Sequence, residues 1–314
     1  MEVGMTREHE ILVGVDGSTA GLHALDWAAA EARTRGLGLR LVVAYSLPSF
    51  TVASLDGGYA ALDDETIRAG AQAVLDEALA HLRDPGVPVH GRVITGDAAG
   101  VLVEESRHVE LAVVGTRGRG GFADRLLGTV SSALPAHGWC PTVVVPLRGA
   151  DGQPLAEGET AQVRPVRRIV VGVDGSPPAE RALRAALREA QAWGAELFAV
   201  TGVPIASMTG ALAWLPSAVD HEQVLRDMAE GLDVVVDRAL ADHPGATVER
   251  RVLDGTGAEL LTEFSAATDL VVVGSRGRGG FAGLLLGSTS QAVLHHARCP
   301  VMVVTNRCDD PTPR

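Results

Sequence analysis

Two glycine-rich segments of this chain have the residue types and spacing to bind a phosphate group. The first reads Gly115, two residues, Gly118, nine residues, then Gly128 and Thr129, and the second repeats this spacing over residues 274–288. Glycine lets backbone N–H groups approach an anion closely, and the N-terminus of a following helix favours negative charge. Each segment follows an apolar run and precedes a candidate helix, which is the order that such a site requires.

Several familiar phosphate and catalytic motifs are excluded by the residues themselves. All 27 of the Lys and Arg residues are arginine, and without lysine there is no Walker P-loop and no Schiff-base chemistry. The first apolar run is followed by Asp16-Gly17-Ser18 rather than by the G-x-G-x-x-G of a dinucleotide fold. Neither segment contains the G-x-S-x-G of a nucleophile elbow. The segments therefore predict anion binding without an evident nucleophile or general base.

The elements around these segments are duplicated. Residues 11–18 reappear as residues 169–176, and Cys140-Pro141 reappears as Cys299-Pro300. The offset between equivalent residues is 158 at the first block and 159 at the later ones. We predict two domains, residues 1–147 and 167–305, each large enough for one core. Residues 148–166 are the expected linker and residues 306–314 the expected tail.

Short apolar runs alternate with helical patterns in both halves. Strands are expected at 11–15, 39–44, 87–94, 111–114 and 142–145, and at the equivalent places of the second half; long amphipathic helices are expected at 64–82 and about 221–241. This alternation predicts an α/β fold of two tandem open parallel sheets, Rossmann-like and five-stranded, with helices on both faces. Ligands of such sheets bind at the carboxyl ends of strands. If the first and fourth strands are neighbours, Asp16 and Asp174 meet the glycine segments.

Composition narrows the classes of partner. The chain has 314 residues, of which 46% are hydrophobic, and a net charge of −12, which disfavours nucleic acid or an anionic membrane as a partner. Neither a signal peptide nor an apolar run of membrane-spanning length is visible. The three cysteines lack metal-ligand spacing, so we expect reduced thiols and a cytoplasmic protein. Cys140 and Cys299 are expected to pack in the core, and Cys308 to be exposed in the tail.

The repeated motif resembles the tandem-domain, ATP-binding form of the universal stress protein family. The resemblance rests on G-x-x-G-x9-G-[S/T] in both halves, on the Val-Gly-Val-Asp-Gly-Ser first turn and on Cys-Pro before the last strand. It implies ATP binding at two sites with little catalysis, in a cytosolic regulator of stress or dormancy. It also implies a homodimer that forms through the edges of the last strands, and a regulatory protein partner that the sequence does not identify.

The resemblance implies a set of nucleotide-binding residues in each half. Asp16 and Asp174 would bind ribose or a phosphate-bound Mg²⁺, the backbone near Val43 and Ala199 would meet adenine, and the glycine segments would hold the phosphates. ATP, with Mg²⁺, is the expected cofactor. The full sets are Gly14, Val15, Asp16, Val43, Gly115, Thr116, Arg117, Gly118, Arg119, Gly120, Gly121, Gly128, Thr129, Val130 and Ser131 in the first half, and Gly172, Val173, Asp174, Ala199, Gly274, Ser275, Arg276, Gly277, Arg278, Gly279, Gly280, Gly287, Ser288, Thr289 and Ser290 in the second.

Other interpretations stay open at this point. The glycine segments could be tight turns, Asp16 and Asp174 could favour helix N-termini, and the arginines could be solvated charges. The function could also be that of a slow Mg-dependent ATPase, a cyclic-nucleotide-binding signalling protein or a scaffold with a structural nucleotide. Pro135 departs from the repeat, because the second half has Leu294 there. We expect it to kink or end the last helix of the first half and so to make the two sites unequal.

Overall fold

The computed structural model describes residues 7–46, 64–82, 85–116, 127–148, 163–204, 221–278 and 285–308. Most of the expected linker, residues 149–162, lies outside these ranges. The predicted site residues outside them are Arg117, Gly118, Arg119, Gly120, Gly121, Gly279 and Gly280.

Strands and helices alternate in both halves in the same order. The first half contains β1 (Glu8–Gly14), α1 (Thr19–Arg35), β2 (Gly38–Tyr45), α2 (Asp64–His81), β3 (Val89–Thr95), α3 (Ala98–Glu105), β4 (Val109–Gly115), α4 (Thr129–His137) and β5 (Thr142–Val145). The second half contains β6 (Arg168–Gly172), α5 (Pro177–Trp193), β7 (Glu196–Val203), α7 (His221–Leu240), β8 (Glu249–Asp254), α8 (Gly257–Phe264), β9 (Leu270–Gly274), α9 (Ser288–His296) and β10 (Val301–Val304). The predicted α/β class and the tandem arrangement are confirmed.

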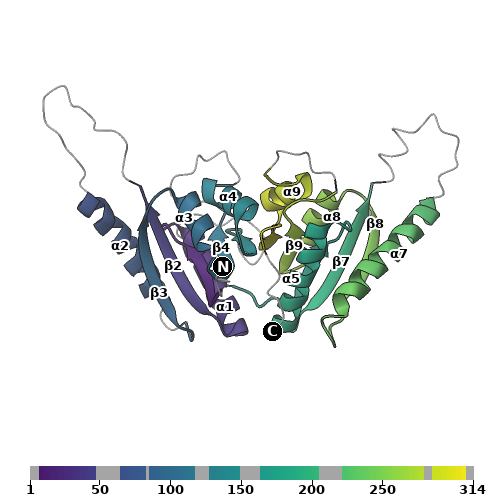
Figure 1. The fold of residues 1–314 in the computed structure, drawn as a ribbon, viewed down its shortest axis with the longest axis horizontal. Helices are drawn as coiled ribbons and strands as arrows, with labels where there is room; N and C mark the ends of the chain where they lie inside the picture. The colour runs from purple at the N-terminus through teal and green to yellow at the C-terminus, as the bar shows by residue number, and fades with distance from the viewer. Residues whose placement is uncertain are drawn as a thin grey trace, which may run out of the picture.

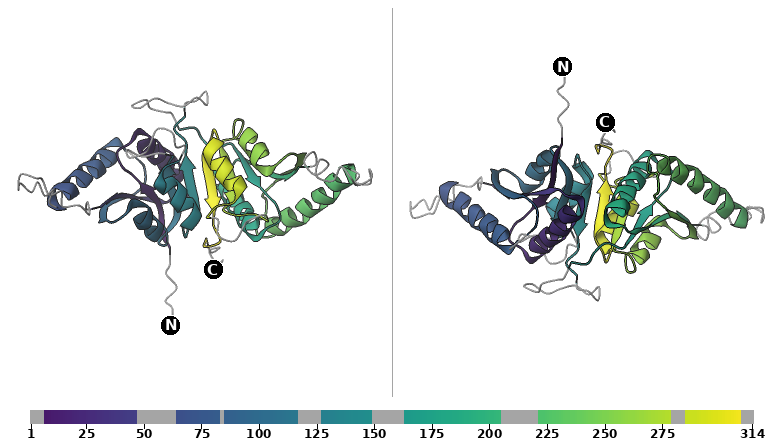
Figure 2. Two further views of the ribbon diagram at one scale, coloured as in Figure 1. Left: turned by 90° about the horizontal axis from the view of Figure 1, so that it is seen from above. Right: turned by 90° about the horizontal axis from the view of Figure 1, so that it is seen from below.

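All of the strands belong to one sheet. Their order is β3-β2-β1-β4-β5-β10-β9-β6-β7-β8, so each half contributes five neighbouring strands (Figure 1). Pairing is parallel within each half, and β5 and β10 join the halves as an antiparallel pair, in which Met302 lies opposite Val143. Figure 2 shows these two strands side by side in the middle of the molecule.

This pairing corrects one expectation. We expected the edges of the last strands to join two copies of the chain. Instead β5 is hydrogen-bonded to β4 and β10, and β10 to β9 and β5, so neither strand has a free edge. The outer edges of the sheet are β3 and β8. The contact that would make a dimer by this route is therefore made within a single chain.

Helices cover both faces of the sheet, as predicted. Side chains alternate along each strand, so that neighbours such as Ile11 and Leu12 belong to different cores. One core lies under α1, α2, α5 and α7, and includes Leu25, Leu75 and Leu183. The other lies under α3, α4, α8 and α9. The first core runs through both halves without interruption, which makes the two halves one folded unit.

Capping residues define where α1 and α5 begin and end. Ser18 and Ser176 are N-caps whose hydroxyls accept the N–H groups of Gly21 and Ala179. Both helices end at a left-handed glycine, Gly36 with φ 68° and Gly194 with φ 64°, a conformation that costs glycine little. The two helices are therefore built alike and have the same length of 17 residues.

Pro135 does not shorten its helix. The helix α4 continues through Pro135 to His137, and α9, which has leucine at that place, has the same length of nine residues. Its first N–H bond to a carbonyl four residues back, from Ser132 to Gly128, lies before the proline. The expectation that Pro135 ends the helix is wrong, because only one N–H is lost and the helix has just two residues left. That Pro135 kinks the helix and makes the two sites unequal stays a prediction.

The C-terminal segment folds back onto the first half. Thr305 Oγ1 donates to the Gly138 carbonyl at 2.8 Å, and Arg307 Nη1 donates to the His137 carbonyl at 3.1 Å. This fold-back buries Cys308, which is only 5% exposed, so the expectation of an exposed thiol is wrong. Cys140 and Cys299 are buried, as predicted. In the part of the chain described here, no helix combines the length and apolarity of a bilayer span.

Candidate functional site

The acid and the glycine segment of each half lie at the same edge of the sheet. We call residues 115–128 the first glycine loop and residues 274–287 the second glycine loop. Strand β1 pairs with β4 and β6 pairs with β9, both in parallel, so each pair ends at the same edge. Asp16 and Asp174 follow β1 and β6, and the loops follow β4 and β9. The strand order reverses between these neighbours, which is where ligands of such sheets bind.

In the second half the acid and the loop are in direct contact. Asp174 Oδ2 accepts the backbone N–H of Arg278 at 2.9 Å, and Oδ1 accepts that of Ser176 at 2.9 Å. Gly175 has φ 72°, and a Cβ built on it would overlap the Arg278 guanidinium. A Cβ on Gly277 would overlap Asp174 Oδ2. Glycine is therefore favoured at 175 by its positive φ and at 277 by the close approach of Asp174, and both features let the turn after β6 pack against the second glycine loop.

The first half has the same turn. Asp16 Oδ1 accepts the Ser18 N–H at 3.0 Å and the Ser18 hydroxyl at 2.6 Å, and Gly17 has φ 74°. Each aspartate thus holds the turn that begins α1 or α5, which agrees with the interpretation of these residues as helix N-terminal acids. In the second half Asp174 has an additional role, because it also holds the loop.

A buried serine closes the neck of each loop. Ser131 Oγ donates to the Thr116 carbonyl at 2.7 Å and accepts the Gly128 N–H at 2.8 Å. Ser290 Oγ donates to the Ser275 carbonyl at 3.0 Å in the same way. Both serines are 2% exposed. A hydroxyl has one proton to donate, so these two, which we expected to reach the phosphates, are engaged with backbone carbonyls in this arrangement.

The donors that remain lie in the first turns of α4 and α9. The first N–H groups of a helix have no partner within the helix, and here they belong to Thr129, Val130, Ser288 and Thr289. Thr129 and Ser288 are exposed at the helix starts. Arg276 and Arg278 are exposed as well and bring positive charge to the second glycine loop. This combination of N–H groups, hydroxyls and arginine suits a phosphate chain.

Several of the predicted glycines have a packing role. A Cβ on Gly115 would lie 2.6 Å from the Ala20 carbonyl oxygen, and one on Gly274 would lie 3.0 Å from that of Pro178. A Cβ on Gly14 or Gly172 would lie 2.7 Å from a leucine methyl group in α3 or α8. Gly115 and Gly274 therefore have a packing role against helix backbone whether or not a ligand is bound, whereas the leucine side chains could shift to accept a Cβ on Gly14 or Gly172.

The strand residues expected near adenine are buried. Val43 is 4% exposed and Ala199 is 0% exposed. The N–H groups of Val15 and Val173 are bonded to the carbonyls of the neighbouring strands, Val42 and Val200, at 3.0 and 2.9 Å. A base could therefore meet only the backbone edge at these places, and the assignment of adenine to them stays a prediction.

Mg²⁺ would need ligands beyond the protein side chains. Among the described residues no group of three or more His, Cys, Asp or Glu side chains is arranged to hold a metal ion. Asp16 and Asp174 each supply one carboxylate, and hard cations accept carboxylate and phosphate oxygens together. The donor set fits a metal that arrives with a nucleotide.

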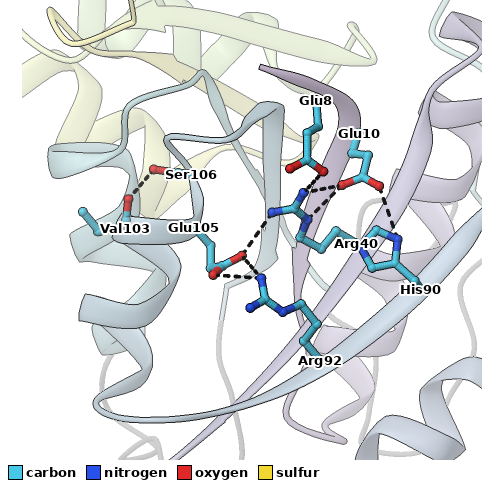
Figure 3. Close-up of polar contacts among 8 residues, drawn as sticks. All are labelled: Glu8, Glu10, Arg40, His90, Arg92, Val103, Glu105 and Ser106. Atoms are coloured by element: carbon cyan, nitrogen blue, oxygen red, sulfur yellow. Dashed lines mark hydrogen bonds and ion pairs between the residues drawn. The ribbon is translucent and has the colours of Figure 1, made fainter. Parts of the chain in front are cut away.

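A separate charged cluster, which the sequence did not reveal, surrounds Arg40 at the opposite end of the strands (Figure 3). The Arg40 side chain is buried and pairs with Glu8, with Glu10 at 2.7 Å and with Glu105 at 3.2 Å. The second half has Phe198 and Phe264 at the places of Arg40 and Glu105, packed against the core. The cluster thus holds β1, β2 and α3 together where the second half uses aromatic packing.

Comparison with known proteins matches this architecture in both halves. The model of the universal stress protein family matches residues 8–146 and again residues 165–305. A universal stress protein of Mycobacterium tuberculosis, Rv2005c, is 35% identical over 305 residues, which cover 95% of this chain and 97% of the relative. A second one, Rv2623, is 33% identical over 304 residues, with 93% and 95% covered. The crystal structure of a universal stress protein from Archaeoglobus fulgidus has the same fold, with a TM-score of 0.65, 20% identity and 95% and 97% covered.

Proposed function

We propose that this chain, which belongs to the universal stress protein family, binds ATP at the glycine loop of each half and acts as a cytoplasmic regulator of stress or dormancy with little catalytic activity. The observation that carries the proposal is the contact between Asp174 and the backbone of Arg278, which brings the acid and the second glycine loop to one site. The Gly128-Thr129 and Gly287-Ser288 pairs provide the matching helix N-termini.

The phosphates would be held mainly by backbone N–H groups. The first-turn groups of α4 and α9 point out of each helix start, where the helix dipole favours negative charge. The Thr129 and Ser288 hydroxyls add donors, and Arg276 and Arg278 add charge at the second site. When bound, Mg²⁺ would neutralise part of the phosphate charge, with Asp16 or Asp174 as its protein ligand. This arrangement favours holding a nucleotide over cleaving it, since the described residues near it include no evident general base other than these two carboxylates.

The test begins with protein purified without added nucleotide. Extraction and mass spectrometry should identify ATP, and calorimetry with Mg²⁺ and ATP should give up to two sites per chain. The Asp16→Ala and Asp174→Ala variants should each lose one of them. Asp227→Ala is the matched control, because this carboxylate lies on α7 and accepts a hydrogen bond from Gln223 at 2.6 Å. If the protein carries no nucleotide and gives no binding heat with ATP, the proposal is wrong.

Two measurements on the same purified protein distinguish the proposed function from that of a slow ATPase and from that of a cyclic-nucleotide sensor. Phosphate release above background, lost in the two aspartate variants, would make the chain a slow ATPase. Tighter binding of cyclic AMP than of ATP would make it a cyclic-nucleotide sensor. Sedimentation with and without ATP shows whether occupancy changes the assembly of the chain or its binding to a regulatory partner, as expected for a regulator.

A further inference from the structure

Two glutamates face each other where α1 of the first half meets α5 of the second. Glu31 and Glu189 occupy equivalent positions of the repeat, 158 residues apart, and so do Arg35 and Trp193. Glu31 is 0% exposed and Glu189 is 3% exposed. Figure 1 shows α1 and α5 next to each other where the two halves meet. The repeat has thus placed two identical acids in the contact between the halves, but with different residues one turn further on.

The two different residues each bind the acid of the other half. Arg35 Nη1 lies 3.3 Å from Glu189 Oε1, while Trp193 Nε1 donates to Glu31 Oε2 at 2.6 Å. Glu31 Oε1 lies 3.7 Å from Arg35 Nη1, and neither it nor Glu189 Oε2, both buried, has a hydrogen-bond partner among the described residues. A proton on one of these carboxyls would give the pair the donor that it lacks.

The charge count leads to the same conclusion. Arg35 is the only cation that the described contacts bring to the pair, and its Nη2 also binds Glu110 Oε2 at 2.8 Å. Glu110 in turn accepts from His9, which is 85% exposed, at 2.6 Å. With all carboxyls ionised, three negative charges would lie around the one half-buried guanidinium of Arg35. Burying an uncompensated charge is far more costly than protonating the group.

Among the contacts that the structure describes, no further charged group of the elements packed against α1 and α5 reaches the pair. Strands β5, β9 and β10 consist of Thr, Val, Leu, Met and Gly residues alone. Most charged side chains of β1, β2, β6, β7 and α7 pair elsewhere. Arg40 pairs with Glu8 and Glu10, Arg168 with Glu196, Arg238 with Glu180, Arg226 with Glu222 and Gln223, and Arg250 of β8 with Asp233 and Asp237 of α7. Asp227 accepts from Gln223, and Glu230 is exposed.

We infer that Glu31 and Glu189 share a single proton, and that the loss of this proton as pH rises weakens the contact between the two halves. The proton is released to solvent and taken up from it, so the change needs no other reactant. The contact would then be a pH-sensitive element of the fold that does not depend on whether the chain binds a nucleotide.

The environment of Glu31 supports a proton on this residue. Burial is the largest cause that raises the pKa of Glu31 well above 4.5, and the nearby charge of Glu189 raises this pKa further. Arg35 and Trp193 act in the opposite direction and do not offset the burial. A carboxyl with a raised pKa stabilises the fold fully below its unfolded pKa, and this contribution is lost as pH rises through the folded pKa.

The experiment compares Glu31→Gln and Glu189→Gln with the unchanged protein in urea unfolding from pH 5 to pH 9. Glutamine keeps the shape of a protonated glutamate and leaves only one carboxylate in the pair. Relative to both variants, the unchanged protein should lose stability with rising pH, by up to tenfold in the unfolding equilibrium constant per pH unit. Hydrogen exchange in α1 and α5, corrected for the intrinsic effect of pH, should rise in parallel in the unchanged protein alone.

Infrared spectroscopy provides the direct reading. The unchanged protein at pH 7 should show the band of a protonated carboxyl, and the Glu31→Gln variant should lack it. The inference is overturned if that band is absent at pH 7, or if both variants keep the pH dependence of the unchanged protein. Should one variant fail to fold, the other carries the same urea test, because each removes one acid of the same pair.

Discussion

A substitution at Gly277 tests the contact between Asp174 and the second glycine loop. A methyl group on Gly277 would overlap Asp174 Oδ2 and would lie 3.4 Å from its Cγ. The carboxylate is not free to turn away, because it accepts the N–H groups of Ser176 and Arg278, each at 2.9 Å. The Gly277→Ala variant can therefore keep the loop in place only by giving up the hydrogen bond from Arg278.

The expected magnitude follows from that hydrogen bond. A hydrogen bond to a charged group contributes about 1.5–3 kcal/mol, and Asp174 is only half-buried. We therefore expect Gly277→Ala to lower the free energy of unfolding of the second half by ~1.5 kcal/mol, or about tenfold in the unfolding equilibrium constant. Asp174→Ala removes both the hydrogen bond and the obstacle. The double variant should then be no less stable than Asp174→Ala alone, which is a strongly non-additive result.

Urea unfolding, followed by fluorescence and by hydrogen exchange in β9 and α9, measures these differences. Gly231→Ala is the matched control, because a Cβ on this α7 residue has no atom within 4 Å. In a helix interior the change from glycine to alanine should raise stability by ~1 kcal/mol. A Gly277→Ala variant as stable as the unchanged protein, or an effect that adds fully to that of Asp174→Ala, would refute the clash between the methyl group and the carboxylate.

Three further predictions concern other parts of the structure. Gly115→Ala should destabilise the first half by ~2 kcal/mol in urea unfolding, with and without ATP, because its Cβ would lie 2.6 Å from the Ala20 carbonyl oxygen; an effect seen only with ATP would contradict the packing role. Arg40→Met should cost ~3 kcal/mol, since removing the arginine leaves three carboxylates close together, and an unchanged urea midpoint would argue against that cluster. Burial raises the pKa of the Cys299 thiol to about 12, so alkylation at pH 8 should label it only after unfolding, as mass spectrometry can show; rapid labelling of the folded protein would refute this.

The parts of the fold that were predicted from the sequence depend on local pattern and repetition. Short Val-rich runs are typical of buried parallel strands, and the repeat of Asp16 as Asp174 placed an acid after the first strand of each half. Once the first and fourth strands are neighbours, the meeting of acid and loop follows. The motif and the expected strand order were therefore enough to predict that Asp174 lies near the second glycine loop, where the structure has its contact with Arg278.

The sequence could not predict the direction in which side chains point or the contacts between segments far apart in the chain. The types of Ser131 and Ser290 were consistent with phosphate binding, but the structure directs their hydroxyls to the loop carbonyls. An apolar last strand pairs equally well with a second chain or with its own repeat, so the choice made by β5 and β10 was invisible. In the sequence Glu31 and Glu189 look like ordinary helix charges, and only the contact between α1 and α5 in the fold brings them together.

Because β5 pairs with β10 of the same chain, the assembly of the two halves does not depend on protein concentration. Each strand of the pair has only four residues, and two separate domains joined by such a short ladder would come apart on dilution. Here both partners belong to one polypeptide, so the local concentration of each strand around the other is set by the connecting segment and not by the number of molecules in the cell. A single newly made copy therefore has both halves assembled. The covalent link also lets the two halves differ in sequence, so that one half has an arginine cluster where the other has an aromatic pair at the equivalent place.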